Sequence, residues 1–177
     1  WANKRLENQE NLQILDLGTG TGAIALALAS ELKQKAQVLG VDFKPEVVVL
    51  AESNRQTLQI ENARFQQSDW LSTLGNQQFD LIVSNPPYID AEDENLQIGD
   101  VRFEPLTALV ADNHGLSDLQ KIIENAPFYL KPNGALFLEH GWQQACDVQH
   151  IFRQNHWQAV ETFQDYANLD RITKAEK

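Results

Sequence analysis

Asp16-Leu17-Gly18-Thr19-Gly20-Thr21-Gly22 is a glycine-rich turn between two apolar segments. Residues 11–17 indicate a short buried strand, and residues 23–32 favour a helix with a broad apolar face. Glycines let a ligand approach the backbone closely, and the N-terminus of a helix offers free N–H groups. A strand, a glycine turn and a helix in this order therefore predict the start of a ligand-binding α/β fold.

Strand-like and helix-like segments alternate along the rest of the chain. This alternation is typical of a mostly parallel sheet with helices on both faces. Residues 157–163 and 171–173 indicate an antiparallel pair that closes the sheet. We therefore expect a Rossmann-like α/β fold with a seven-stranded sheet. The other expected strands are 37–41, 63–66, 79–83 and 135–139, the expected helices are 45–58, 116–130 and 143–153, residues 106–110 favour a short strand or hairpin arm, and residues 132–134 favour a turn.

The composition fits one ordinary folded domain, because 42% of the 177 residues are hydrophobic and 22% are charged. The net charge of −11, without any Lys/Arg cluster, argues against direct nucleic-acid binding. The single Cys146 excludes an internal disulfide and gives no metal-ligand spacing, so we expect no metal. Without a signal peptide or an apolar run of membrane length, we expect a cytoplasmic protein with no membrane partner.

Acidic residues follow the second and third expected strands. Asp42 lies about twenty residues beyond the glycines, where a carboxylate can accept hydrogen bonds from both ribose hydroxyls of a nucleotide. The alternative for Asp42 is a cap on the following helix. Asp69 and Trp70 could hold an adenine, with the carboxylate accepting from the exocyclic amine. Trp70 could equally be a core residue.

Ser84-Asn85-Pro86-Pro87-Tyr88 follows the fourth expected strand. The two prolines have no N–H and push the residues before them toward extended geometry, so the turn is rigid and rich in acceptors. The Asn85 side chain and the Pro86 carbonyl can then face one point, with the aromatic ring of Tyr88 beside them. This arrangement suits a planar –NH2 group. A simple proline-rich turn after a strand is the alternative.

The glycine turn alone does not identify the ligand. Gly18-x-Gly20-x-x-Ala23, followed by Asp42, also satisfies the dinucleotide-binding pattern. Asp16 has no role in binding a pyrophosphate but could bind an ammonium group, such as that at the methionine end of S-adenosylmethionine. The Asn85 turn has no place in hydride chemistry and suits an amino-group acceptor. These two features favour methyl transfer over a dinucleotide reaction.

Together, these motifs resemble class I S-adenosylmethionine-dependent methyltransferases. Three segments, residues 84–89, 102–109 and 138–141, are similar to the HemK/PrmC-type glutamine N5-methyltransferases. The resemblance extends from about Ile14 to Arg171. It implies transfer of a methyl group from S-adenosyl-L-methionine to the glutamine of the Gly-Gly-Gln loop in class I peptide chain release factors, with S-adenosyl-L-homocysteine as the product.

The resemblance also implies which residues form the site. Asn85, Pro86 and Tyr88 are the expected catalytic residues, and Asn85, Pro86, Pro87, Tyr88 and Glu104 are expected to bind the substrate. If the Asn85 side chain and the Pro86 carbonyl each accept one amide N–H, the nitrogen lone pair is directed toward the methyl donor. The expected cofactor-binding residues are Asp16, Gly18, Thr19, Gly20, Gly22, Asp42, Phe43, Asp69, Trp70 and Asn85.

The ends of the chain depart from the family pattern. The chain begins at Trp1 and contains no Met, which favours a fragment of a longer product. The family's N-terminal helical domain and its Pro-Arg-Pro-(Asp/Glu)-Thr-Glu segment do not occur here, and residues 174–177 make a short polar end. We therefore expect residues 1–177 to be the catalytic domain without the substrate-docking domain, and to be monomeric.

Two other functions compete with this interpretation. A nucleic-acid amino methyltransferase acting on adenine or guanine would also use the Asn85 turn, since a base presents a planar –NH2 group. The net charge of −11 and the absence of a target-recognition domain argue against it. A non-catalytic fragment that binds S-adenosylmethionine is the third hypothesis.

Overall fold

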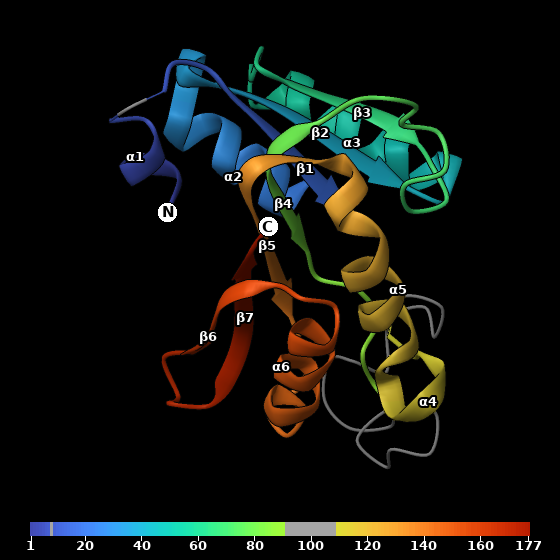
Figure 1. The fold of residues 1–177 in the computed structure, drawn as a ribbon. Helices are drawn as coiled ribbons and strands as arrows, with labels where there is room; N and C mark the ends of the chain where they lie inside the picture. Colours follow the sequence, from blue (N-terminus) through green and yellow to red (C-terminus); the bar gives the residue numbers. More distant parts are fainter. Residues whose placement is uncertain (8, 91–108) are drawn as a thin grey trace. The chain divides into compact units, whose positions relative to one another are not determined.

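The computed structural model describes residues 1–7, 9–90 and 109–177. It divides into a first unit (residues 1–84, 126–136 and 177) and a second unit (residues 85–125 and 137–176). In the described residues the sheet has seven strands, as the sequence predicted, and the strands follow the order β3-β2-β1-β4-β5-β7-β6 (Figure 1). The elements are α1 (Ala2–Arg5), β1 (Leu12–Leu17), α2 (Ala23–Leu32), η1 (Lys33–Lys35), β2 (Ala36–Asp42), α3 (Pro45–Thr57), β3 (Ala63–Gln67), β4 (Phe79–Ser84), α4 (Asp112–Gly115), α5 (Ser117–Asn125), η5 (Ala126–Tyr129), β5 (Leu130–Glu139), α6 (Ala145–Gln154), β6 (Gln158–Gln164) and β7 (Asp170–Glu176).

The first unit is a parallel arrangement centred on β1. β1 pairs in parallel with β2 on one side and with β4 on the other, and β2 pairs in parallel with β3. A central parallel strand is covered on both faces, so its residues read as a continuous apolar run. Four apolar side chains of β1 are fully buried, and α2 adds a buried face against this sheet: Leu12, Ile14, Leu15 and Leu17, with Ala25, Leu26, Ala29 and Leu32.

The second unit contains the predicted antiparallel pair. β6 and β7 pair in antiparallel register, with Phe163 opposite Ile172, and Figure 1 shows α6 beside them. The core here joins α5 to α6: Phe152 and Trp157 meet edge to face with ring centroids 5.4 Å apart, and the Trp157 indole N–H donates to the Ile123 carbonyl at 3.2 Å. This unit therefore has its own apolar core.

Three segments differ from the sequence-based expectation. The polar start of the chain contains the short helix α1, which was not predicted. The helix expected over 116–130 ends at Asn125, because Pro127 lacks an N–H and disfavours helical geometry in the residue before it. The turn predicted at 132–134 lies inside β5, where Asn133 takes the left-handed conformation and the Gly134 carbonyl accepts the Lys177 N–H at 2.9 Å.

No helix among residues 1–7, 9–90 and 109–177 combines the length and the apolar character that crossing a membrane requires.

Residues 106–110, which were expected to form a short strand or hairpin arm, lie partly outside the described residues. In the described part, Val110 forms an isolated parallel bridge with Ile89.

Candidate active site

Backbone hydrogen bonds bring the ends of β1, β2 and β3 together in the first unit. The Thr19 N–H, in the loop after β1, donates to the Val41 carbonyl at 2.9 Å. The Ser68 N–H, after β3, donates to the Asp42 carbonyl at 2.9 Å. Three of the predicted strand-end motifs therefore converge, as the switch-point rule for parallel sheets requires.

Asp16 is a buried carboxylate in β1, directly before the glycine loop. Its Oδ2 atom accepts from the Thr19 hydroxyl at 2.6 Å and from the Ala25 N–H, in the first turn of α2, at 3.1 Å. Among the described residues, its Oδ1 atom is buried and has no hydrogen-bond partner. A buried carboxylate oxygen without a partner is costly, so Asp16 presents an acceptor that a bound donor can satisfy.

The electrostatics of Asp16 agree with this geometry. Burial raises the pKa of Asp16 from its ordinary value of 3.8 to about 7, although the hydrogen bonds from Thr19 and Ala25 oppose the rise. The nearby charge of Asp42 raises this pKa further. A cationic ligand would favour the ionised carboxylate and offset the burial penalty. The residues therefore fit the ammonium group predicted for this position.

The glycine loop leaves room for close approach to the backbone. Gly22 is the N-cap of α2 with φ of 84°, and an added Cβ would lie only 2.9 Å from the Phe65 ring. A side chain is therefore excluded at Gly22 by both conformation and space. Gly20 has no atom within 4 Å of the position that a Cβ would occupy, so this part of the loop is open.

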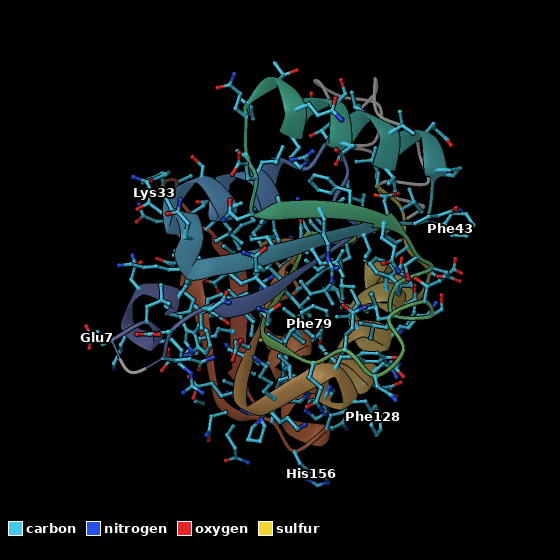
Figure 2. The ribbon with its side chains drawn as sticks, turned by 90° about the horizontal axis from the view of Figure 1, so that it is seen from above. Glu7, Lys33, Phe43, Phe79, Phe128 and His156 are labelled. Atoms are coloured by element: carbon cyan, nitrogen blue, oxygen red, sulfur yellow. The ribbon has the colours of Figure 1, made fainter. Side chains whose placement is uncertain are left out.

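Asp42 ends β2, and its carboxylate connects the glycine loop to the residue before α3. One carboxylate oxygen accepts the Gly20 N–H at 3.0 Å, and the other accepts the Lys44 N–H at 3.0 Å. The alternative role as a helix cap is not what the structure shows, because Lys44 is the N-cap residue of α3. Figure 2 shows the next residue, Phe43, at the edge of the molecule, and its side chain is 67% exposed.

Trp70 lies over the glycine loop. Its ring would come within 3.5 Å of a Cβ added at Gly18, and its side chain is half-buried, so it is neither a free surface residue nor a fully buried one. The buried Ser68 hydroxyl donates to the Trp70 carbonyl at 2.7 Å and fixes the turn. Asp69, between these two residues, is exposed. The Trp70 ring therefore lies beside the loop, and its contact with an adenine stays a prediction.

The Asn85 turn belongs to the second unit. It begins one residue after Ser84, whose hydroxyl donates to the Leu17 carbonyl at 2.7 Å and anchors the end of β4. The Asn85 side chain is exposed, Pro86 is buried, and Pro87 and Tyr88 are half-buried. A buried proline beside an exposed amide is the arrangement expected of a rigid acceptor turn open to a ligand.

The side-chain hydroxyl and the backbone carbonyl of Tyr88 are both hydrogen-bonded within the second unit. Its hydroxyl donates to the Glu139 carboxylate at 3.2 Å, and its carbonyl accepts from the Gln144 side chain at 2.9 Å. Burial, together with the Glu139 charge, raises the pKa of Tyr88 above its ordinary value of 10. The phenol therefore stays protonated at neutral pH and acts as a donor.

Among the histidines, His140 takes a structural position, and His114, His150 and His156 lie on the surface. His140 is buried, with its ring nitrogens 2.8 Å from the Thr173 hydroxyl and 2.9 Å from the Gly141 carbonyl, and burial lowers its pKa. His114 pairs with Asp90 at 2.7 Å and is exposed. Over the described ranges, no three His, Cys, Asp or Glu residues gather as a metal site.

The predicted substrate residue Glu104 lies outside the described residues.

Sequence reasoning missed the residues that support the Asn85 turn. Glu139 lies in one of the segments that carried the resemblance, but we did not predict it as a site residue. Gln144 contacts Tyr88 across 56 residues of sequence, and no local pattern marks it. Gly115 also packs against the Tyr88 carbonyl. Only the tertiary structure brings these three residues together.

Comparison with known proteins gives two kinds of relationship. Residues 8–174 match a family model described as a methyltransferase domain. The release factor glutamine methyltransferase of Haemophilus influenzae is 56% identical over 174 residues, covering 94% of this chain and 59% of the relative. The protein of the same name from Escherichia coli K12 is 53% identical, covering 93% of this chain and 59% of the relative. The chain thus spans less than two thirds of these relatives.

Solved structures share the fold at low sequence identity. A 16S rRNA methyltransferase from T. thermophilus, solved in complex with AdoMet and guanosine, superposes with a TM-score of 0.66 at 24% identity. The match covers 99% of this chain and 41% of that chain. At this identity the match supports the architecture of the sheet and its helices, and no more.

Proposed function

Because the chain belongs to the methyltransferase domain family, we propose that it is the catalytic domain of a release factor glutamine methyltransferase. On this proposal it transfers a methyl group from S-adenosyl-L-methionine to the side-chain amide nitrogen of the glutamine in the Gly-Gly-Gln loop of class I release factors. S-adenosyl-L-homocysteine is the product. The identity of more than half of the aligned residues to enzymes of that name carries the proposal.

The first unit supplies the proposed cofactor site. Asp16 offers its unpartnered Oδ1 atom to the ammonium group, and the open backbone at Gly20 lets the cofactor approach the loop. Asp42 accepts hydrogen bonds at the end of β2, where it would hold the ribose hydroxyls. Trp70 and Asp69 would hold the adenine. When bound, the cofactor supplies an electrophilic methyl group carried on a sulfonium ion.

The second unit supplies the proposed acceptor for the substrate amide. An amide nitrogen is a poor nucleophile because its lone pair is delocalised into the carbonyl group. The Asn85 side-chain oxygen and the Pro86 carbonyl would each accept one amide N–H and so fix the nitrogen in a reactive orientation. Two neutral carbonyl dipoles also stabilise the positive charge that grows on nitrogen as the nitrogen–methyl bond forms and the methyl–sulfur bond breaks. The cationic nitrogen then loses one proton to solvent, which leaves the methylated amide. Tyr88 would pack on the planar amide.

The proposed substrate is a protein rather than a nucleic acid. The net charge of −11 disfavours a surface that binds phosphates, and the relatives at 50% identity or more carry the release factor name. Nucleic-acid methylation stays the alternative because a base also presents a planar –NH2 group to an Asn85-type turn.

Transfer of a labelled methyl group tests the proposal. The chain is incubated with labelled S-adenosylmethionine and either a class I release factor, the same factor with the Gly-Gly-Gln glutamine replaced by alanine, or rRNA and DNA. We expect label only on the unchanged release factor. Label on the nucleic acids, or equal label on both release factors, would contradict the proposal.

A further inference from the structure

A short turn in the second unit has an unusual backbone. Asn113, His114 and Gly115 have consecutive φ values of 55°, 54° and 78°. L-residues rarely take this left-handed conformation, and two of the three are not glycine. Such strain persists only where surrounding contacts hold it, and it is commonly found at functional sites. The contacts of this turn therefore indicate what the strain serves.

The turn places Gly115 directly against the Asn85 turn. A Cβ added at Gly115 would collide with the Tyr88 carbonyl oxygen, and it would lie 2.6 Å from the Tyr88 carbonyl carbon. It would also lie 2.8 Å from the Gln144 Nε2 atom. Only glycine fits both the conformation and the space here. The left-handed turn thus lets two backbone segments approach closely at the Tyr88 carbonyl.

Gln144 connects the same segments through its side-chain amide. Its Nε2 atom donates to the Tyr88 carbonyl at 2.9 Å and to the His114 carbonyl at 3.0 Å. Its Oε1 atom accepts the Gly141 N–H at 2.8 Å. Both donor hydrogens and the acceptor oxygen are therefore in use, which makes the side-chain orientation unique.

The residues after Tyr88 are fixed to the same region. The Ile89 N–H donates to the Leu109 carbonyl at 2.8 Å, and the Ala111 N–H donates to the Ile89 carbonyl at 3.1 Å. Asp90 pairs with His114 in the strained turn at 2.7 Å. Residues 88–90 are therefore tied to residues 109–115 by backbone, side-chain and packing contacts.

We propose that Gln144 and Gly115 form a clamp on the Tyr88 carbonyl and are positioning residues for the substrate-binding acceptors of Asn85 and Pro86. Only Pro86 and Pro87 separate Asn85 from Tyr88, and both have a fixed φ. A displacement of Tyr88 is therefore transmitted to Asn85 with little bending between them. Since reactive orientation is sensitive to small displacements, loosening the clamp lowers turnover. This inference rests on the proposed methyl transfer.

Gln144→Glu tests the clamp with little change in shape. The introduced carboxylate still accepts the Gly141 N–H but faces the Tyr88 and His114 carbonyls without a donor. We expect kcat for release-factor methylation to fall about tenfold, because the acceptors lose their orientation. The affinity for S-adenosylmethionine should stay within a few-fold, because Asp16 and Asp42, which would hold the ammonium group and the ribose, lie in the first unit. Gln143→Glu, an exposed neighbour with the same charge change, is the matched control.

Two glycine variants separate the clamp from general backbone strain. Gly115→Ala and Gly75→Ala both place a side chain at positive φ, but nothing lies within 4 Å of a Cβ at Gly75. We expect Gly115→Ala to lower kcat and Gly75→Ala to keep the wild-type kcat. The two variants are compared under conditions in which both are folded, as judged by their melting temperatures. If Gly115→Ala does not fold, the Gln144→Glu comparison decides alone.

Hydrogen exchange at the Tyr88, Ile89 and Asp90 amides gives a readout independent of activity. We expect faster exchange there in Gln144→Glu than in the wild type or Gln143→Glu. A wild-type chain that transfers no methyl group to release factors would contradict the proposed function. The hydrogen-exchange rates at these amides would then still test the clamp. Unchanged kcat and unchanged exchange in Gln144→Glu would overturn the clamp itself.

Discussion

The glycine loop of the first unit and the Asn85 turn of the second unit are held in place by different kinds of contact. Asp16 is fixed by Thr19 and Ala25, three and nine residues away, and Asp42 is fixed to Gly20 across 22 residues. Tyr88, by contrast, depends on Glu139 and Gln144, 51 and 56 residues away. The carboxylates of Asp16 and Asp42 are hydrogen-bonded to residues within 22 positions along the chain, whereas the hydroxyl and the carbonyl of Tyr88 are hydrogen-bonded to residues 51 and 56 positions away.

This difference separates two proposed tasks. A loop beside a buried carboxylate with one unpartnered oxygen suits binding of a small cationic cofactor. A rigid turn that is hydrogen-bonded to other segments suits the orientation of a substrate group, because the acceptors of the turn must point in fixed directions. Substitutions in the first unit should therefore change cofactor affinity, and substitutions in the Asn85 turn should change turnover.

The largest effect is expected from Asn85→Ala. Removing one of the two acceptors of the amide N–H groups should lower kcat for methyl transfer by about a hundredfold to a thousandfold, as for other aligned catalytic hydrogen bonds. S-adenosylmethionine affinity, measured by calorimetry, should stay within a few-fold. The exposed Asn76→Ala serves as control. Turnover equal to that of the wild type would remove Asn85 from the proposed mechanism.

Asp42→Ala should give the opposite pattern. The variant loses the acceptor proposed for the ribose and the bonds to the Gly20 and Lys44 N–H groups, so cofactor affinity should fall about tenfold to a hundredfold. At saturating cofactor, kcat should recover most of its wild-type value. Glu46→Ala, at the start of α3, is the matched control. A loss of kcat without a loss of affinity would break the proposed division between the units.

The pH dependence of cofactor affinity should follow Asp16. Its pKa of about 7 means that the carboxyl is mostly neutral below that pH, whereas an ammonium ligand favours the ionised form. Affinity should therefore rise as pH increases toward 7, by about tenfold per unit at the acidic end, and level off above it. Calorimetric titration from pH 5 to 8.5 measures this, with Asp147→Asn as an exposed control. A profile that stays unchanged in Asp16→Asn would contradict the assignment.

Tyr88→Phe should have the smallest effect. The ring and the carbonyl contacts to Gln144 and Gly115 remain, and the bond of the hydroxyl to Glu139 at 3.2 Å and its interaction with Arg171 are lost. We expect kcat to fall roughly threefold, because the lost hydrogen bond supports the Asn85 turn and does not touch the proposed substrate. Steady-state kinetics on the release factor provide the measurement. A loss as large as that of Asn85→Ala would mean that the hydroxyl acts on the substrate directly.

The sequence predicted most of the sheet because its elements follow from local patterns. Residues 12–17 form a buried strand and residues 23–32 form a helix, as their apolar periodicity and glycine turn indicate. The errors lie where local and distant influences compete. The residues of the expected Pro132-Asn133-Gly134 turn are strand instead, since the end of the chain pairs with Gly134. Local sequence carries no information on such a partner.

The residues of the candidate site also divide into those that local sequence could predict and those that it could not. Asp16, Gly20 and Asp42 could be found because their spacing after a strand has a chemical meaning, and the structure brings them together. Gln144 and Gly115 could not be found, because their contact with Tyr88 depends on the folded second unit. The roles of all these residues in catalysis and binding stay predictions.

The most direct test of the account is the position of the transferred methyl group. A class I release factor is treated with the chain and S-adenosylmethionine, digested, and examined by fragmentation mass spectrometry. The account predicts a single methyl group on the side-chain nitrogen of the Gly-Gly-Gln glutamine, formed at least about a hundredfold more slowly when Asn85→Ala replaces the wild-type chain. A methyl group on another residue, or one that appears equally with Asn85→Ala, would contradict it.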